Sequence, residues 1–114
     1  MKNILTLKKN YEFRYVLNKG KAYYGNQIIV YINKNKKGTN ILGIAINTKL
    51  GKAVKRNKVK RLIRENYRII NKEIEQGYNI VFLWNKNKNI EQANYFEIKN
   101  DMKNIFKRAK LLKI

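Results

Sequence analysis

The sequence contains neither cysteine nor histidine, and each absence excludes a class of chemistry. Without cysteine the chain has no disulfide, no thiol nucleophile and no zinc–thiolate site. Without histidine it lacks the commonest general base and the commonest nitrogen ligand for metals. Its 7 carboxylates are scattered along the chain, which argues against a divalent-metal site built by the protein alone. We therefore expect no catalytic residue and no metal ligand in the chain, and a self-contained hydrolase is the weaker hypothesis.

Long hydrophobic runs are also missing from the sequence. No stretch approaches the roughly 20 apolar residues of a membrane span, and residues 4–7 (ILTL) are too short for the apolar core of a signal peptide. We therefore expect a cytoplasmic protein that does not contact the membrane. The chain has 114 residues, 44% of them hydrophobic, which fits a single domain over residues 1–114 with one core.

Positive charge is what the sequence has in abundance. There are 27 Lys and Arg residues against 7 Asp and Glu, which gives a formal net charge of +20 on a chain of 13.6 kDa. Such a chain repels itself, and a polyanionic partner that neutralises it is the simplest reason for the charge. Nucleic acid is the first candidate, because phosphates bind Lys and Arg with release of counterions. An anionic membrane surface is the alternative.

Proline is absent too, so glycine and asparagine must mark helix ends and turns. Apolar spacing predicts a short helix at 11–18, ended by Gly20, and longer helices at 57–76, ended by Gly77, and at 90–112. Short β-branched runs predict strands at 27–32 and 41–46, joined by the basic loop 33–40 as an antiparallel hairpin, and a buried strand at 79–84. The order α-β-β-α-β-α favours a mixed sheet with helices over one face. Its β-α-β crossover is right-handed by default.

The predicted helix at 57–76 combines an apolar face with a cationic face. At about 100° per residue, one side carries the apolar residues Val59, Leu62, Ile63, Ile70 and Ile74. The other side carries Lys58, Lys60, Arg61, Arg64 and Arg68, and Asn57 is suited to cap the N-terminus. A solvated lysine-rich surface explains most helices of this kind. Here we favour nucleic-acid binding, because clustered arginines repel one another and a planar guanidinium fork suits phosphates.

The segment LGKAVKRNKVKRLIRE, residues 50–65, resembles the signature of the bacterial ribonuclease P protein family. The matching positions are Gly51, Ala53, Val54, Arg56, Asn57, Lys60, Arg61, Arg64 and Glu65. The resemblance continues outside the signature. Phe13-x-x-Val16 followed by Gly20 is similar to the first helix of the family, and Leu42-Gly43 ahead of Lys49 is similar to the strand before the signature. The run at 77–81 (GYNIV) is similar to its last strand, so the likeness spans nearly the whole chain.

The resemblance implies a protein cofactor of a ribozyme, whose RNA subunit removes the 5′ leader of precursor tRNA in a Mg²⁺-dependent hydrolysis. The implied fold is a single-domain α-β-β-β-α-β-α sandwich of the α+β class, with a mixed sheet and an unusual left-handed β-α-β crossover, like domain 2 of ribosomal protein S5. The implied RNA-subunit contacts are Arg56, Asn57, Lys58, Lys60, Arg61, Arg64 and Arg68. The implied leader contacts are Phe13, Leu17, Tyr31 and Lys49. Mg²⁺ would sit mainly on the RNA, with no metal held tightly by the protein, which would be a monomer with one copy per RNA.

Three departures from the family pattern affect contact details. Lys58 replaces the final arginine of the family's Arg-Asn-Arg triplet. Leu17 stands where a second phenylalanine is common, and Lys52 stands where asparagine is usual. A small basic ribosomal-type RNA-binding protein is the main alternative, although it would not need the ordered Arg-Asn-x-x-Lys-Arg-x-x-Arg-Glu motif. A stand-alone nuclease would need carboxylates or a histidine base that the chain barely has, and a membrane-surface peptide is the remaining class.

Overall fold

The computed structural model describes residues 4–113. Within that range the helices are α1 (Asn10–Lys19), α2 (Ala53–Ile70) and α3 (Tyr95–Arg108), and the strands are β1 (Lys21–Tyr24), β2 (Ile28–Lys34), β3 (Ile41–Ala45) and β4 (Tyr78–Trp84). Short 3-10 turns are found at η1 (Thr48–Leu50), η2 (Asn71–Glu73) and η3 (Ile90–Gln92). The order is α-β-β-β-α-β-α, which confirms the α+β fold implied by the family resemblance. Strand β1 is short and partly exposed, and the apolar pattern had not predicted it.

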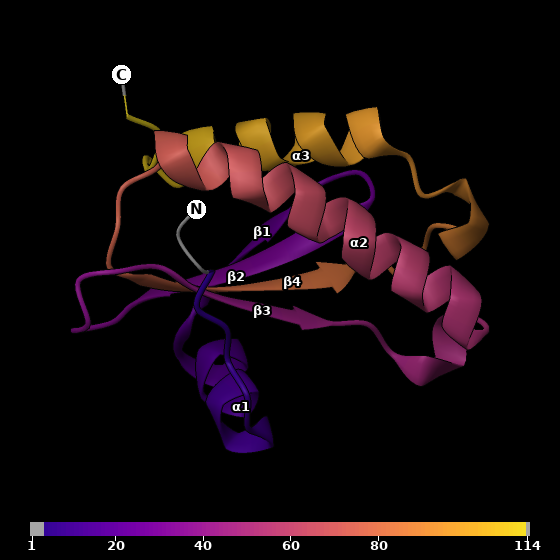
Figure 1. Ribbon diagram of the computed structural model, residues 1–114, viewed down its shortest axis with the longest axis horizontal. Helices are drawn as coiled ribbons and strands as arrows, with labels where there is room; N and C mark the ends of the chain where they lie inside the picture. The colour runs from indigo at the N-terminus through magenta and orange to yellow at the C-terminus, as the bar shows by residue number, and fades with distance from the viewer. Residues whose placement is uncertain (1–3, 114) are drawn as a thin grey trace.

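The strands form one mixed sheet in the order β1-β2-β4-β3. Strand β2 is antiparallel to both of its neighbours, whereas β3 and β4 are parallel. Helices α2 and α3 lie side by side over one face of the sheet, and α1 packs on the opposite face (Figure 1). The expectation that helices cover one face is therefore wrong for α1. That helix is held on its own face because the ring of Phe13 approaches the bare backbone of Gly43 there.

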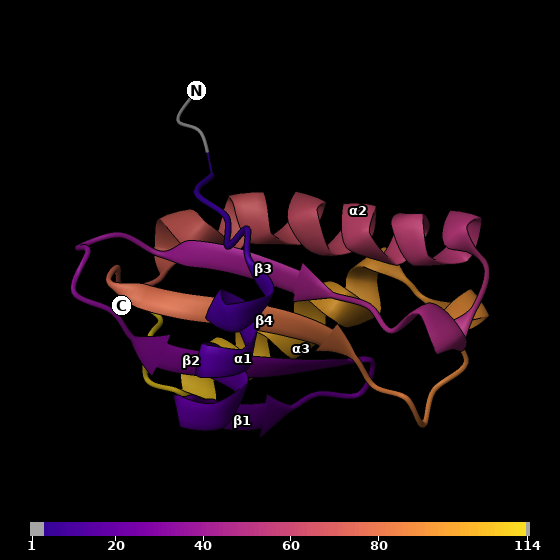
Figure 2. The same cartoon turned by 90° about the horizontal axis from the view of Figure 1, so that it is seen from below.

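The crossover from β3 through α2 to β4 is left-handed. In Figure 2, α2 lies behind the sheet, β3 and β4 both run from left to right, and β4 lies below β3. A right-handed connection would place β4 above β3 in this view. The handedness implied by the family resemblance is thus confirmed, and the right-handed default is wrong.

The main core lies between the sheet and the two helices α2 and α3. Strand β2 alternates strictly, with Ile28, Val30 and Ile32 buried toward the helices. At the centre, Phe82 of β4 makes edge-to-face contacts with Tyr67 of α2 and Phe106 of α3, at centroid distances of 5.8 and 6.4 Å. The apolar helix faces predicted from the sequence are buried here, which confirms them. No helix within residues 4–113 is long and apolar enough to cross a membrane.

The predicted hairpin between residues 27–32 and 41–46 is wrong, because β4 lies between these two strands. Strand β4 is nearly continuous in apolar residues, and Ile80, Val81 and Phe82 are all buried, so both of its faces and both of its edges are covered. Asn40 fixes the connection around it. Its side-chain oxygen accepts from the backbone N–H of Tyr78 at 2.9 Å, and its side-chain nitrogen donates to the carbonyl of Glu75 at 2.9 Å.

Helix boundaries differ from the sequence expectation at four places, one of which is the end of α3 at Arg108 instead of residue 112. Helix α2 begins at Ala53, so Asn57 lies inside the helix and does not cap it. It ends at Ile70, and Gly77, with φ of 103°, forms the turn into β4 instead of ending the helix. Helix α3 begins at Tyr95 because the side chain of Asn94 accepts from two backbone N–H groups of the first turn, while residues 90–92 form the separate turn η3.

Candidate nucleic-acid interface

The outward side of α2 carries a cluster of cations, which we call the basic face. Because the apolar stripe of α2 is buried on the sheet, the cationic positions on its other side face solvent. Its members are Arg56, Asn57, Lys58, Lys60, Arg61, Arg64 and Arg68. Arg56 and Lys60 are half-buried and the others are exposed. Glu65 is the acid among them, at 3.9 Å from Arg61, and such an exposed pair neutralises little of the charge. The face can therefore bind several phosphates at once.

Arg56 has a second role that the sequence did not reveal. Its Nη1 donates to the carbonyl oxygen of Gly51 at 2.5 Å and, more weakly, to that of Thr48 at 3.4 Å. The guanidinium therefore holds the turn η1 against the first turn of α2. Lys52, at the N-cap, makes no side-chain capping bond. The hydrogen bond from Arg56 to Gly51 is therefore the side-chain contact that joins the start of α2 to η1.

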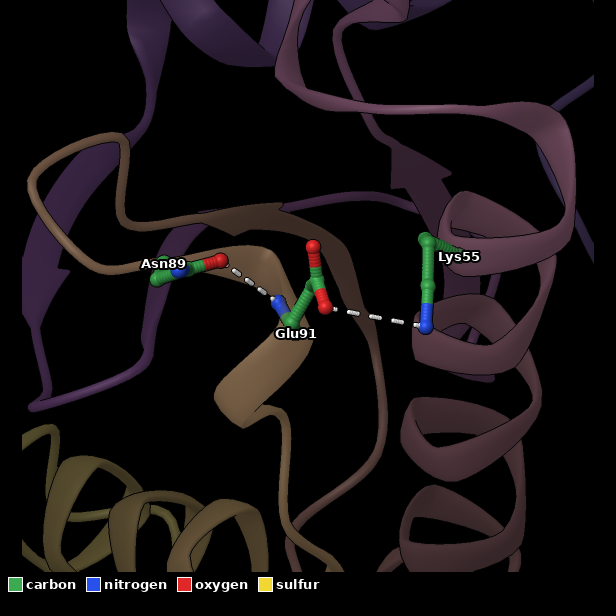
Figure 3. Close-up of polar contacts among 3 residues, drawn as sticks. All are labelled: Lys55, Asn89 and Glu91. Atoms are coloured by element: carbon green, nitrogen blue, oxygen red, sulfur yellow. Dashed lines mark hydrogen bonds and ion pairs between the residues drawn. The ribbon is translucent and has the colours of Figure 1, made fainter.

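A second contact joins the first turn of α2 to η3. Nζ of Lys55 lies 3.8 Å from a carboxylate oxygen of Glu91 in η3, and the backbone N–H of Glu91 donates to the side chain of Asn89 at 2.9 Å (Figure 3). Both members of the ion pair are exposed, so it contributes little to stability. The contact orients Lys55 toward η3. The first turn of α2, where the basic face begins, therefore lies beside η3.

The opposite face of the sheet carries a half-open groove. The strand register aligns four residues in one row across all four strands: Tyr24, Ile29, Leu83 and Ala45. Helix α1 packs over the neighbouring part of this face and leaves the row open. The space above it, about 490 Å³, is bordered by Asn47 and Leu50 at one end of β3 and by the turn 85–87 after β4. We call this space the sheet groove.

Tyr31 lies in the next row and also lines the sheet groove. Its side chain is half-buried, and burial is the main cause that raises the pKa of its hydroxyl, with the neighbouring hydroxyl of Tyr24 adding to the shift. The hydroxyl therefore stays protonated at neutral pH and can donate as well as accept hydrogen bonds. An apolar floor edged by two tyrosines offers flat surfaces on which unpaired bases can stack.

The other three residues expected at the leader site do not line this groove. Phe13 lines a separate hollow of about 210 Å³ at the edge of β3, together with Gly43 and Arg64 of the basic face. Lys49 is exposed in η1, between the groove residues Asn47 and Leu50. Leu17 is half-buried on α1 and lines neither space. The structure thus places Tyr31 in the groove and Lys49 in the turn at its border, and it sets Phe13 nearer to the basic face.

Several groove residues were missed by reading the sequence. Ile29 and Leu83 alternate with the buried residues of β2 and β4, so strand alternation could have assigned them to the second face of the sheet. Tyr24 was missed because β1 itself was not predicted. Within residues 4–113 no cluster of three Asp, Glu, His or Cys residues could hold a metal ion.

A basic helix on one side of the sheet and an aromatic groove on the other define a nucleic-acid-binding protein of the α+β class. The family model described as Ribonuclease P matches residues 1–110. A Clostridium kluyveri protein named ribonuclease P protein component is 40% identical over 113 residues, which cover 97% of this chain and 99% of that protein. The Fusobacterium nucleatum protein of the same name is 38% identical over 109 residues, with 94% and 98% covered.

Solved structures agree with this assignment. The structure of the Staphylococcus aureus RNase P protein aligns with a TM-score of 0.82 at 31% identity, over 97% of this chain and all of that one (100%). The RNase P protein from Thermotoga maritima aligns with a TM-score of 0.80 at 30% identity, over 90% and 96%. The chain belongs to the ribonuclease P protein family, whose work is tRNA processing.

Proposed function

We propose that this chain is the protein subunit of a ribonuclease P in which the RNA subunit carries out the cleavage of precursor tRNA. Family membership supports the role in processing the tRNA 5′ end. The composition supports the division of labour, because the chain has no histidine or cysteine and its described residues hold no metal-binding cluster. In this proposal one monomer acts with one RNA subunit in the cytoplasm.

The basic face of α2 is our candidate for the contact with the RNA subunit. Its cations project from a helix whose opposite side is locked into the core, so their spacing is fixed before RNA binds. Cations on a fixed helix leave less backbone entropy to be lost on binding than cations on a mobile loop. Phosphate contacts of this kind release counterions and supply most of the affinity.

The sheet groove is our candidate for the 5′ leader. A single strand can lay its bases on the rings and apolar side chains of the groove while its phosphates meet Lys49 at the border. From there the strand would run toward α1, where Phe13 and Leu17 lie. The observation that carries this proposal is that the basic face and the groove occupy opposite faces of one sheet. One small protein can therefore hold the RNA subunit and the substrate leader at the same time.

Mg²⁺ is expected to act on the RNA and not on the protein. Bound to the RNA, the ion would supply the activated water and the charge stabilisation that phosphodiester hydrolysis needs. The residues of this chain do not fit such an ion, since hard cations need several oxygen ligands and no carboxylate cluster is present within residues 4–113. The protein's part is to bind the substrate and hold it in place.

Reconstitution tests the proposed function. We expect the purified protein to restore cleavage of precursor tRNA by a bacterial ribonuclease P RNA at a low Mg²⁺ concentration at which the RNA alone is inactive. The protein without RNA should cleave nothing under the same conditions. Cleavage by the protein alone, or no gain in cleavage on adding it to the RNA, would contradict the proposal. A preparation heated beyond unfolding serves as the control for non-specific charge effects.

A further inference from the structure

We propose that the leader site continues past Tyr31, over the ring of Tyr24, into an amide-lined hollow between β1 and α3, where one further nucleotide of the same strand binds. This inference rests on the proposed leader binding and extends it. The hollow, which we call the amide hollow, measures about 300 Å³ and is lined by Asn26, Asn100, Asp101, Asn104 and Arg108.

Tyr24 connects the two spaces. It is the outermost residue of the row that forms the groove floor, and it lines both the sheet groove and the amide hollow. Its side chain is 61% exposed, although an aromatic ring gains stability from burial. A strand that follows the row from β3 to β1 must cross this ring, and the ring is free to stack on a base.

The amide hollow presents the groups that read base edges. Asn100 and Asn104 are four residues apart on α3 and therefore lie on the same side of the helix. Arg108 donates from Nε to the side-chain oxygen of Asn104 at 2.7 Å and from Nη2 to the backbone carbonyl of Tyr24 at 2.7 Å. These bonds orient the Asn104 amide. Its side-chain nitrogen donates no hydrogen bond to any group within residues 4–113. Paired amide donors and acceptors are suited to the edges of bases.

The frame around the hollow is rigid. The buried carboxylate of Asp101 accepts from the backbone N–H groups of Asn26 at 2.9 Å, Gln27 at 2.7 Å and Ile28 at 3.2 Å. A side chain at Gly25 would come within 2.7 Å of the Asp101 carboxylate carbon, so the turn between β1 and β2 is packed directly on α3. A site whose walls are fixed in this way binds without first having to order them.

The position of the hollow favours RNA as the occupant. Three backbone donors hold the Asp101 carboxylate, and the carboxylate of Glu97 accepts from the side chain of Asn26 at 2.6 Å, so both nearby acids are engaged. Arg108 supplies the positive charge at the rim. The hollow lies by β1, at the edge of the sheet opposite to β3, whereas α2 lies nearest to β3 (Figure 2). A strand in the hollow is therefore continuous with the groove and remote from the basic face.

The test uses the assembled holoenzyme and a series of precursor tRNAs whose leaders grow one nucleotide at a time. We expect the affinity of the unchanged protein to rise in steps and the last step to disappear in Tyr24→Ala and in Asn100→Ala. The loss for the longest leaders should be about 5-fold or more, the lower bound for one stacked base. Mature tRNA and the shortest leaders should bind as before. Tyr24→Phe should retain the step, and Phe96→Ala, an exposed aromatic of α3 one turn before Asn100 that does not line the hollow, is the matched control.

Two patterns of results overturn the inference. If Tyr24→Ala and Asn100→Ala leave every leader unaffected while Tyr31→Ala still weakens leader binding, the groove ends at Tyr31 and the proposed leader site stands. If both variants weaken short and long leaders equally, they act on the fold and not on an added nucleotide, and melting temperatures will show it. If Tyr24→Ala, Asn100→Ala and Tyr31→Ala all leave the affinity for leader-bearing precursor unchanged, the result contradicts the leader site itself. A base preference at the added position that Asn100→Ala abolishes would support the amide contact specifically.

Discussion

The guanidinium of Arg56 donates to the carbonyl oxygen of Gly51, five residues earlier in the chain, at 2.5 Å. This contact lies at the junction of the two proposed RNA surfaces, because Gly51 ends the turn that borders the sheet groove and Arg56 opens the basic face. A residue chosen from the sequence for its charge thus also shapes the turn beside the groove.

We expect Arg56→Ala and Arg64→Ala to differ in stability although both lower RNA affinity. Arg56→Ala removes a charged donor from two carbonyls and should lower the free energy of unfolding by about 1–2 kcal/mol. Arg64 is exposed and has no such bond within residues 4–113, so its loss should stay within about 0.5 kcal/mol. Urea titrations measure the free energy of unfolding, and titrations with the RNA subunit measure the RNA affinity. Equal stability of the two variants would show that the Gly51 contact contributes nothing.

The affinity for the RNA subunit should depend steeply on salt. Six cations of the basic face are available: Arg56, Lys58, Lys60, Arg61, Arg64 and Arg68. If about six phosphates are neutralised, the affinity should fall roughly 10³-fold between about 50 and 200 mM monovalent salt. Each alanine variant on the face should reduce the slope of the log–log plot by about one contact. A binding constant that does not change with salt contradicts the electrostatic account.

Gly43 should not tolerate a side chain. A Cβ there would lie 2.8 Å from the ring of Phe13, 3.0 Å from Leu7 and 3.2 Å from Val81. We expect Gly43→Ala to lower the free energy of unfolding by about 1–3 kcal/mol, as overpacking does. Replacing the opposing ring by a smaller side chain, in a Gly43→Ala/Phe13→Leu double variant, should restore part of the lost free energy of unfolding. A double-mutant cycle with no coupling between the two positions would show that α1 does not pack on Gly43 in solution.

The sequence predicted which faces are buried better than which strands pair. The apolar spacing of α2 and α3 identified side chains that are buried, because helix periodicity is a local property. The pairing of β2 with β4 is not local: it depends on β4 being apolar on both faces and on Asn40 turning the chain around its beginning. The left-handed crossover could not be obtained from the pattern at all, since the general rule favours the other hand.

In the candidate site too, the features that depend on one element were predicted and those that depend on strand pairing were not. The cations of the basic face were found from charge and helical spacing, which require only one element. The groove required the register of four strands, and Tyr24 and Leu83 meet in one row although they are far apart in the sequence. Arg56 was assigned to RNA from its motif, while its bond to Gly51 became visible only in three dimensions.

Stability and RNA affinity should be nearly constant between about pH 6 and 9, because the chain has no histidine to titrate there. Burial raises the pKa of Tyr67 and of Tyr31, so both hydroxyls favour their neutral form in the folded protein. Their contribution is complete below the unfolded pKa of about 10 and is lost as pH rises above it. Tyr67→Phe should therefore flatten the loss of stability above about pH 10, whereas Tyr11→Phe, at an exposed position, should not. Parallel alkaline curves for the two variants would contradict the burial of Tyr67.

Tyr31→Ala should separate substrate binding from assembly. The ring lines the sheet groove and lies on the face opposite to the basic face, so we expect the affinity for the RNA subunit to remain unchanged. The affinity of the holoenzyme for leader-bearing precursor should fall by about 1–3 kcal/mol, the range measured for one stacked base, and the affinity for mature tRNA should not fall. Because Tyr31 is half-buried, its removal also costs some stability, and Tyr31→Phe controls for this by keeping the ring while removing the hydroxyl. A Tyr31→Ala variant that melts lower yet still distinguishes precursor from mature tRNA as well as the unchanged protein does would show that the ring supports the sheet and does not contact the leader.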